Sequence, residues 1–290
     1  MTARDFVVEA SGIPLSGLLA EPAVSPPRAV VVALPGNAML ARYFDGPVDP
    51  KGSLLGLGAG DGFTVWALDR PGYGASAGAP DERLGLFAQV DLVHAAFDRF
   101  SDDHEVGAGF FVVAHSYGLK LALAMAADPR GERILGIDGV GTGYRYTFDH
   151  DRGPDVVTTP GDRGAPWGPG HLYPAGTFDR GRLPLGRAPA AQGVREAIEW
   201  PTVLESIAPT IVQPVRFTYG SHERLWPIDD ESLRELRELF TSSRRVETCI
   251  QEGAGHNVSL SNAARAYHAR ALANAAVCVA EAYPRSGRSG

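Results

Sequence analysis

A serine stands in a sequence context that could turn its hydroxyl group into a nucleophile. Residues 114–118 read Ala-His-Ser-Tyr-Gly; they follow a strongly apolar run and precede an apolar stretch that starts at Leu119. Small residues two positions before and after Ser116 permit the tight strand-to-helix turn called a nucleophile elbow. The first N–H groups of the following helix would lie below the hydroxyl. The motif of such elbows is Gly-x-Ser-x-Gly, and here Ala114 replaces the first glycine. The added methyl group should be tolerated, although it makes the match weaker. Ser116 is therefore the candidate nucleophile.

A serine hydroxyl needs a general base at neutral pH, and one histidine is well placed to supply it. Among eight histidines, His256 lies between the last expected strand (residues 245–251) and the C-terminal helix, on a loop with Gly253 and Gly255. Elbow-type serine sites take their base from the end of the chain. His256 is therefore the predicted base. His115, beside the serine, is expected to point away from it and to be structural.

A carboxylate should orient the base and stabilise its charged form. Glu223 follows the expected strand at residues 214–219, one helix and one strand before His256. Asp138, at the end of the expected strand at residues 133–138, occupies the other position that this arrangement uses. Position in the chain favours Glu223 as the acid and leaves Asp138 as the alternative. Asp229 and Asp230 are weaker candidates than either.

Acyl transfer also requires hydrogen-bond donors for the developing oxyanion. One should be the backbone N–H of Tyr117, the residue after the nucleophile. The other should come from the loop after the strand at residues 28–34, where Gly36 lets the chain turn its N–H groups inward. Asn37 is the favoured second donor, followed by Ala38.

The elements that must position these residues alternate along the chain. Continuous apolar runs at residues 28–34, 63–68 and 109–114 suit strands buried on both faces of a parallel sheet. The remaining expected elements are an opening hairpin (6–9 and 15–20), helices (81–100, 117–127, 229–240 and about 259–282) and strands (133–138, 214–219 and 245–251). This order predicts an α/β fold with a mostly parallel, doubly wound sheet.

One segment departs from the alternation. Residues 141–205 hold 11 glycines and 8 prolines among 65 residues, with scattered aromatics. Such a long irregular stretch within a compact domain is usually functional or disordered. We expect a lid or cap insertion there, an α/β core formed by residues 1–140 and 206–283, and a flexible tail at 284–290.

Further short motifs make the chain resemble the α/β-hydrolase superfamily. Residues 69–76 (Asp-Arg-Pro-Gly-Tyr-Gly-Ala-Ser) and 34–36 (Leu-Pro-Gly) resemble loops of its esterases, and the elbow, Gly-Ser-His-Glu at 220–223 and Gly-His-Asn at 255–257 follow in the expected order. The resemblance, which excludes the lid and tail, implies an α/β-hydrolase fold. It also implies hydrolysis of a carboxylic ester through an acyl-enzyme on Ser116, with His256 and Glu223 completing a triad.

The same machinery serves several reactions, because a fold does not select a substrate. The alternative hypothesis is an enzyme of a biosynthetic pathway: a thioesterase, an acyltransferase or cyclase, or a C–C bond hydrolase. A noncatalytic ligand-binding homologue is an alternative of another class. A serine at position 116 argues against haloalkane dehalogenase and epoxide hydrolase chemistry, for which an aspartate is expected at the elbow.

Composition narrows the range of partners. A formal net charge of -7 and the lack of a basic stripe argue against nucleic acid. No run of eighteen apolar residues and no apolar leader is present, so we expect a cytoplasmic protein without a membrane partner. The two cysteines, Cys249 and Cys278, form no metal or redox motif, and no cofactor or metal is expected. The expected partner is a small-molecule acyl substrate, and the sequence is compatible with a homo-oligomer.

Overall fold

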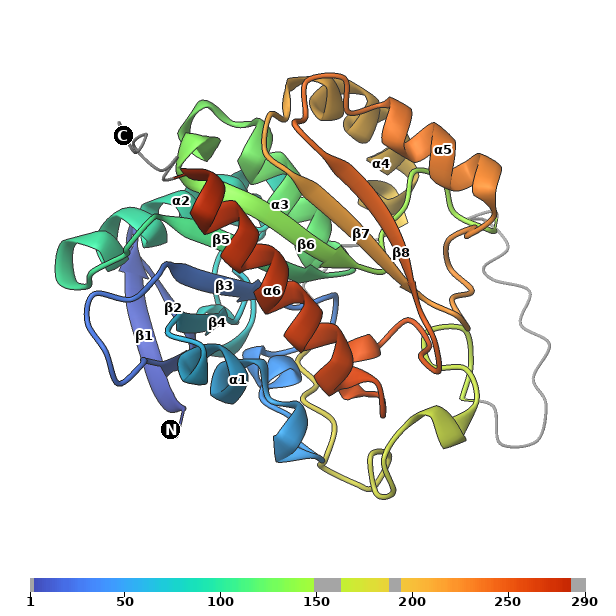
Figure 1. The fold of residues 1–290 in the computed structure, drawn as a ribbon, viewed down its shortest axis with the longest axis horizontal. Coiled ribbons are helices and arrows are strands. Elements are labelled where there is room, and N and C mark those ends of the chain that lie inside the picture. The colour runs from blue at the N-terminus through green and yellow to red at the C-terminus, as the bar shows by residue number, and fades with distance from the viewer. Residues whose placement is uncertain (1–2, 149–162, 188–193, 283–290) are drawn as a thin grey trace, which may run out of the picture.

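A single eight-stranded sheet organises the computed structural model, which describes residues 3–148, 163–187 and 194–282 (Figure 1). The strand order is β1-β2-β4-β3-β5-β6-β7-β8. The strands are β1 (Arg4–Ala10), β2 (Ile13–Ala20), β3 (Val30–Leu34), β4 (Thr64–Leu68), β5 (Phe110–His115), β6 (Ile134–Val140), β7 (Val215–Gly220) and β8 (Val246–Gln251). Strands β3 to β8 are parallel to one another, whereas β1 and β2 form an antiparallel hairpin beside β4. The predicted fold class is confirmed.

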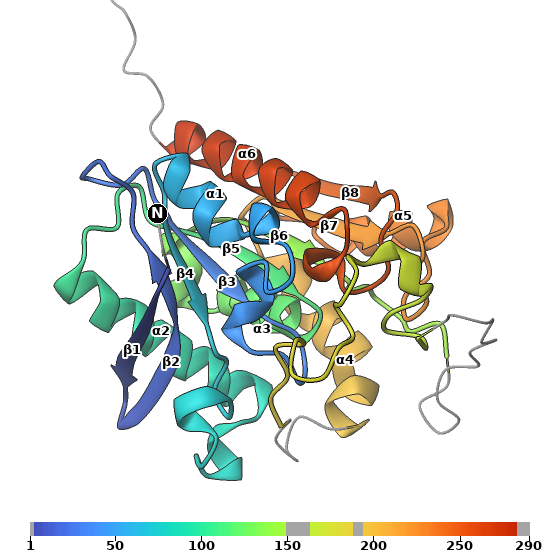
Figure 2. The ribbon, with the colours of Figure 1, turned by 90° about the horizontal axis from the view of Figure 1, so that it is seen from below.

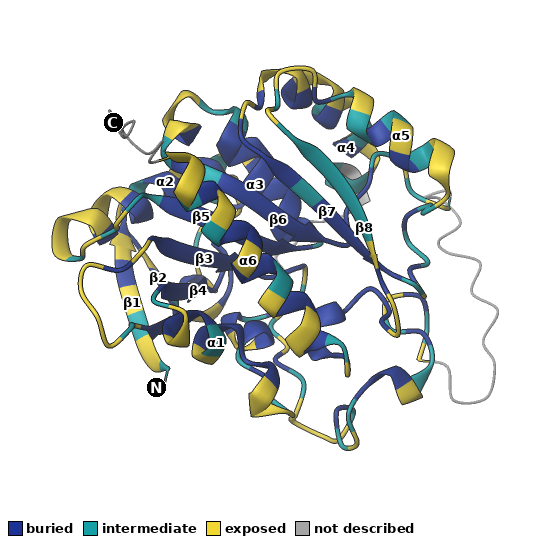
Figure 3. Cartoon of the chain, in the orientation of Figure 1, coloured by how far each residue is buried: buried dark blue, intermediate teal, exposed yellow. Residues whose placement is uncertain are grey.

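Helices cover both faces of this sheet. They are α1 (Leu54–Gly60), α2 (Leu86–Asp103), α3 (Tyr117–Ala127), α4 (Val194–Ile207), α5 (Asp230–Glu238) and α6 (Ala264–Ala282). In Figure 2, α1 and α6 lie on one side of the sheet, and α2 and α3 lie on the other. A separate hydrophobic cluster fills each side. Strands β3, β4 and β5 are buried along their whole length (Figure 3), which explains their uninterrupted apolar sequences.

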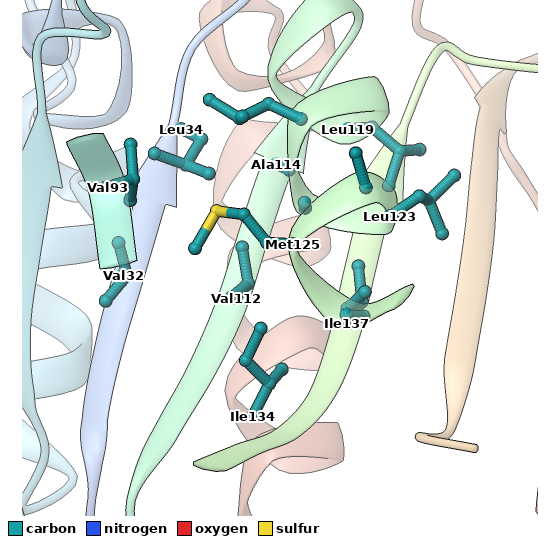
Figure 4. Packing of buried hydrophobic residues seen from close by; sticks show 14 of the residues in the cluster. Val32, Leu34, Val93, Val112, Ala114, Leu119, Leu123, Met125, Ile134 and Ile137 are labelled. Carbon is teal, nitrogen blue, oxygen red and sulfur yellow. The ribbon is translucent and has the colours of Figure 1, made fainter. Parts of the chain in front are cut away.

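Helix α3 packs closely on the carboxyl ends of the central strands. Leu119 and Leu123 of α3 lie with Leu34 and Ala114 in one cluster of buried side chains (Figure 4). A Cβ atom at Gly118 would lie 2.2 Å from the carbonyl oxygen of Leu34, so only glycine allows this approach of helix and strand. The packing therefore fixes where α3 begins, directly after Ser116.

Several boundaries differ from the prediction for local reasons. Helix α2 begins at Leu86, after a 3-10 turn at Asp81–Arg83, and α6 begins at Ala264, after a 3-10 turn at Val258–Leu260. Helix α1 was not predicted, because its seven residues include three glycines. In the described part of the chain, no helix is both long enough and apolar enough to cross a membrane.

Most of helix α4 lies within the segment at residues 141–205, for which the sequence predicted no regular element. A proline, Pro201, lies inside the helix, where this residue type is strongly disfavoured. Its Trp200 is buried and donates a hydrogen bond from Nε1 to the carbonyl of Gly143 at 2.9 Å. Tertiary packing thus outweighs local propensity. Parts of the expected lid, residues 149–162 and 188–193, and the expected tail lie outside the described residues.

Candidate active site

Ser116 occupies the turn between β5 and α3 in a strained backbone conformation. Its φ of 52° and ψ of -120° lie in a region that residues other than glycine rarely adopt. Such a conformation costs roughly 1–3 kcal/mol and persists where the surroundings hold it. Here the Ser116 N–H donates to the carbonyl of Val140 at 2.8 Å, and the Ser116 carbonyl accepts from Thr142 Oγ1 at 2.8 Å. The turn is therefore anchored to the end of β6.

His256 and Glu223 lie together in a buried pair. The His256 Nδ1 atom is 2.8 Å from Glu223 Oε2, and both residues are less than one-tenth exposed. The other carboxylate oxygen of Glu223 accepts hydrogen bonds from the backbone N–H groups of Arg224 and Leu225, at 3.0 and 2.9 Å. Because an ionised carboxylate only accepts, Nδ1 carries the proton of the neutral ring and Nε2 is left as a proton acceptor.

One short segment, residues 140–142, connects the Ser116 turn to His256. Ser116 bonds to Val140 and Thr142, as described above. Between them, Gly141 has a φ of 69°, and a Cβ atom placed on it would lie 2.7 Å from Nδ1 of His256. The histidine ring and the serine turn therefore abut the same three residues at the carboxyl end of β6.

His115, the residue before the serine, lies between the rings of Tyr43 and His256. Its ring stacks on Tyr43 with centroids 4.6 Å apart, and its centroid is 4.8 Å from that of His256. Burial, followed by repulsion from a charged His256, lowers the pKa of His115 well below its usual value. His115 is therefore neutral at pH 7 and packs against the ring of His256.

Asp138, the alternative acid, lies elsewhere. It sits within β6, paired in register with Arg216 of β7. Its Oδ2 atom is 3.2 Å from Nη1 of Arg216 and 3.2 Å from Nδ2 of Asn274 on α6. Burial is the main cause that raises the pKa of Asp138 to about 6. The structure thus brings Glu223, and not Asp138, to His256.

The loop after β3 lies directly against the serine. A Cβ atom at Gly36 would lie 3.0 Å from the Cβ of Ser116. The side-chain oxygen of Asn37 accepts from the hydroxyl of Tyr73 at 2.7 Å, and the N–H of Ala38 donates to that same hydroxyl at 3.0 Å. Because the Ala38 N–H is already engaged, the geometry favours Asn37 over Ala38 as a donor for a ligand at Ser116.

A mostly apolar recess of about 270 Å³ opens beside Tyr117. Helices α2, α3 and α4 form its walls. Its lining consists of Gly85, Leu86, Phe87, Ala88, Tyr117, Lys120, Glu196, Glu199, Trp200 and Val203. Tyr117, the residue after Ser116, connects the recess to the elbow along the chain, whereas Ser116 and His256 are not among the described residues that line it.

From the sequence, Lys120 follows Ser116 at a spacing that does not suit a lysine base, and it is predicted to lie on the helix surface or in contact with the lid; the surface placement is wrong. Its side chain is buried, and Nζ donates to the hydroxyl of Tyr146 at 2.8 Å. Nζ also lies 4.9–5.8 Å from the ring centroids of Tyr146, Trp200 and Trp226. Burial lowers the pKa of Lys120 to about 7, and the negative charge of Glu196 opposes part of that change. These three aromatic rings form a cage around Lys120. Tyr146 and Trp200 belong to the scattered aromatic residues of 141–205, whereas Trp226 lies beyond that segment.

The buried lysine predicts an unusual pH dependence of stability. The folded state has a pKa of about 7 at Lys120 against 10.5 for the ordinary group, so the unfolded state binds more protons between these values. The destabilisation by Lys120 is therefore complete below pH 7 and disappears as the pH rises towards 10.5. In Lys120→Met, which removes the charge and keeps the volume, the gain in unfolding free energy over wild type should shrink by about 2 kcal/mol between pH 7 and pH 9. Urea unfolding at both pH values measures it, and an unchanged difference would contradict the lowered pKa.

Two described parts of the 141–205 segment pack against the loops around Ser116. The carbonyl of Pro166 accepts from Nδ2 of Asn257 at 2.7 Å, next to His256. The N–H of Leu40 donates to Pro184, and the N–H of Gly186 donates to Ala38. The segment thus contacts the loop that carries the histidine and the loop that carries Asn37.

No group of three histidine, cysteine, aspartate or glutamate side chains arranged to hold a metal ion occurs within residues 3–148, 163–187 and 194–282. The polar groups that the structure places at residues 140–142 and on the loop after β3 are a serine hydroxyl, an imidazole with its carboxylate, and backbone N–H groups. These are the groups that acyl transfer uses.

Comparisons with known proteins agree with this architecture. One similar solved structure is a lipase in an open form, with a TM-score of 0.68 and 18% sequence identity over 98% of this chain and 100% of that chain. Another is a monoacylglycerol lipase from Paleococcus ferrophilus, with a TM-score of 0.63 and 16% identity over 97% of this chain and 99% of that chain. An epoxide hydrolase from Vigna radiata is also similar, with a TM-score of 0.61 and 16% identity over 95% of this chain and 98% of that chain. At these identities the likeness concerns the fold alone. No curated protein matches the sequence. A sequence model of the alpha/beta hydrolase family matches residues 31–270, most of the 290 residues, and the chain therefore belongs to this family.

Proposed function

We propose that this member of the alpha/beta hydrolase family is a serine hydrolase that cleaves a carboxylic ester, with Ser116, His256 and Glu223 as its catalytic triad. The observation that carries the proposal is the buried His256–Glu223 pair, 2.8 Å apart, held at the same β6 segment as the strained Ser116 turn. A strained serine beside an oriented imidazole is the arrangement that activates a hydroxyl group.

The geometry supports a two-step reaction. The Ser116 hydroxyl oxygen attacks the ester carbonyl carbon while Nε2 of His256 takes its proton, and Glu223 stabilises the imidazolium through Nδ1. The negative oxygen of the tetrahedral intermediate accepts from the N–H groups of Tyr117 and Asn37. The imidazolium then protonates the leaving alcohol as the ester C–O bond breaks. Water, deprotonated by His256, attacks the acyl-enzyme and releases the acid and the serine.

The recess beside Tyr117 is the proposed binding place for the acyl group. Its walls are mainly aliphatic and aromatic, including Leu86, Trp200 and Val203, so burial of alkyl carbons there lowers the free energy of the complex. The rate of hydrolysis should therefore rise from an acetyl ester to esters with longer acyl chains until the recess is full.

A series of p-nitrophenyl esters with increasing acyl length tests the proposal. Wild type should show a kcat/KM that rises and then levels off. Val203→Trp, which fills the recess from α4, should remove the rise while the acetyl ester is hydrolysed as before. A folded protein that hydrolyses none of these esters would contradict the proposed reaction, and an unaltered profile in Val203→Trp would contradict the proposed acyl site. A matched series of thioesters measures the alternative leaving group.

Gly141 provides a local test of the position of His256. In Gly141→Ala the new methyl group would lie 2.7 Å from the imidazole, so the ring must move away from Glu223 and from the serine. A misplacement of about 1 Å in a catalytic group costs about 100-fold in rate, and we expect kcat to fall by about that factor.

The control is Gly253→Ala in the same loop as His256. Gly253 has a φ of 70°, nearly that of Gly141, but a Cβ atom there has no neighbour within 4 Å among the described residues. Both variants thus place a Cβ atom at nearly the same positive φ, and only the first has a clash. Equal loss of kcat in the two variants would assign the effect to strain and contradict the proposed position of His256.

A further inference from the structure

Arg70 is a fully buried cation outside the proposed triad, and it holds the loop beside Ser116. Its Nε atom donates to the carbonyl of Pro35 at 2.8 Å, and its Nη2 atom donates to the carbonyl of Gly36 at 3.2 Å. In a planar trans peptide, the C=O and the following N–H point in opposite directions. Because the Gly36 carbonyl faces Arg70, the N–H of Asn37 points away from the guanidinium. Arg70 thereby fixes the direction of the proposed second oxyanion donor.

The same guanidinium also contacts the residue that carries the first donor. Its Cζ atom lies 4.3 Å from the ring centroid of Tyr117. Its Nη1 atom donates to Oε1 of Gln89 at 3.0 Å, and Nε2 of Gln89 lies 3.3 Å from the hydroxyl of Tyr117, to which it donates. Gln89 is fully buried. Arg70 and Gln89 therefore hold the side chain of Tyr117, the first residue of α3, in place.

Helix α4 completes this network from the opposite side. The hydroxyl of Tyr117 donates a hydrogen bond to Oε2 of Glu196. The other carboxylate oxygen of Glu196 accepts from the N–H of Leu86 at 2.8 Å, where α2 begins. A carboxylate from the 141–205 segment thus bridges the first residue of α2 and the first residue of α3.

We propose that Arg70, Gln89 and Glu196 are positioning residues that align the N–H groups of Asn37 and Tyr117, so that the contact of Glu196 with Tyr117 couples the placement of α4 to the rate of the chemical step. This inference rests on the proposed function, because it assigns a role in stabilising the oxyanion. Substrate that packs against α4 in the recess would favour the aligned state. The acyl group would in this way contribute to kcat and not only to binding.

A double-mutant cycle tests the coupling. Tyr117→Phe removes the hydroxyl that connects Gln89 and Glu196, and Glu196→Ala removes the carboxylate. Each should lower kcat for the preferred ester about tenfold, with KM changed less than twofold, because both variants lose the hydrogen bond between the Tyr117 hydroxyl and Glu196 that aligns a donor. The double variant should be no slower than the slower single variant, since both changes remove the same connection. The rate of labelling by a fluorophosphonate, which also forms a tetrahedral oxyanion-like product, should fall in parallel.

Glu205→Ala is the matched control. Glu205 also lies on α4, and its carboxylate also accepts from a tyrosine hydroxyl, that of Tyr144, but this pair is exposed. This variant should keep the kcat of wild type. Arg70→Lys serves as a second variant, because it keeps the charge and loses the forked contacts to Pro35 and Gly36; its kcat should also fall with little change in KM.

The outcomes separate this inference from the proposed function. If wild type is labelled at Ser116 and hydrolyses esters while Tyr117→Phe and Glu196→Ala retain full kcat, the coupling is wrong and the proposed function stands. Strictly multiplicative losses in the double variant would likewise overturn the coupling. If Ser116→Ala retains ester hydrolysis, the proposed function itself fails.

Discussion

Ser116→Ala should lower kcat for ester hydrolysis by about 10⁵-fold and leave the fold intact. The change removes the atom that forms the acyl-enzyme, so the reaction can proceed only by direct attack of water at the oxyanion donors. Triad members act as a unit, so His256→Ala should cost a similar factor and the double variant little more than either. Loss of one hydroxyl oxygen from the half-buried Ser116 should scarcely affect the unfolding temperature.

Single-turnover hydrolysis of a chromogenic ester measures this loss, with the thermal transition of each variant as the check on folding. Ser206→Ala, which removes an exposed hydroxyl that donates to the carbonyl of Val203 on α4, is the control and should retain the rate of wild type. If Ser116→Ala keeps even a tenth of the rate of wild type, the serine is not the nucleophile. If wild type hydrolyses no ester, a ligand-binding role that survives in Ser116→Ala would favour the noncatalytic class.

Glu223→Gln should lower kcat by about 10⁴-fold with little loss of stability. The amide is nearly isosteric and its oxygen can still accept from the N–H groups of Arg224 and Leu225. Its NH₂ group would then face Nδ1 of His256, which favours the tautomer with the proton on Nε2. The ring could not accept the proton of Ser116 in that form, as in other triads whose acid is replaced by an amide.

Asp138→Asn separates catalysis from structure. Asp138 pairs with Arg216 and Asn274 within the sheet and under α6, and the amide oxygen of an asparagine can still accept from Arg216. Because burial raises the pKa of Asp138, the charged carboxylate is disfavoured in the folded state, and the neutral replacement should change the free energy of unfolding by no more than about 1 kcal/mol. Its kcat should stay within a fewfold of wild type. Urea unfolding and ester hydrolysis of both variants decide the matter. Loss of kcat in Asp138→Asn and its retention in Glu223→Gln would reverse the assignment of the acid.

The sequence predicted the sheet and the order of the proposed site residues because strong local patterns mark them. The apolar runs of β3, β4 and β5 are buried on both faces, and the turn residues after each run lie at the carboxyl edge. A glycine at 118, required by the close approach of Leu34, and a glycine-flanked His256 were visible for the same reason.

Long-range contacts between side chains had no such signal. The choice between Glu223 and Asp138 depends on which carboxylate reaches the imidazole, and only the folded chain shows the 2.8 Å contact of Glu223. The cage around Lys120 gathers residues from α3, α4 and two loops, and the Glu196–Tyr117 contact joins positions 79 residues apart. Helix α4 itself was missed because packing of Trp200 stabilises a sequence that contains an internal proline.

The most direct test of the central claim is the mass of the intact protein after exposure to a fluorophosphonate, for wild type and Ser116→Ala. An activated serine attacks the phosphorus and expels fluoride, so wild type should gain one adduct that peptide mapping places on Ser116, and Ser116→Ala should gain none. A folded wild type that stays unlabelled, or an adduct that persists in Ser116→Ala, would contradict the account.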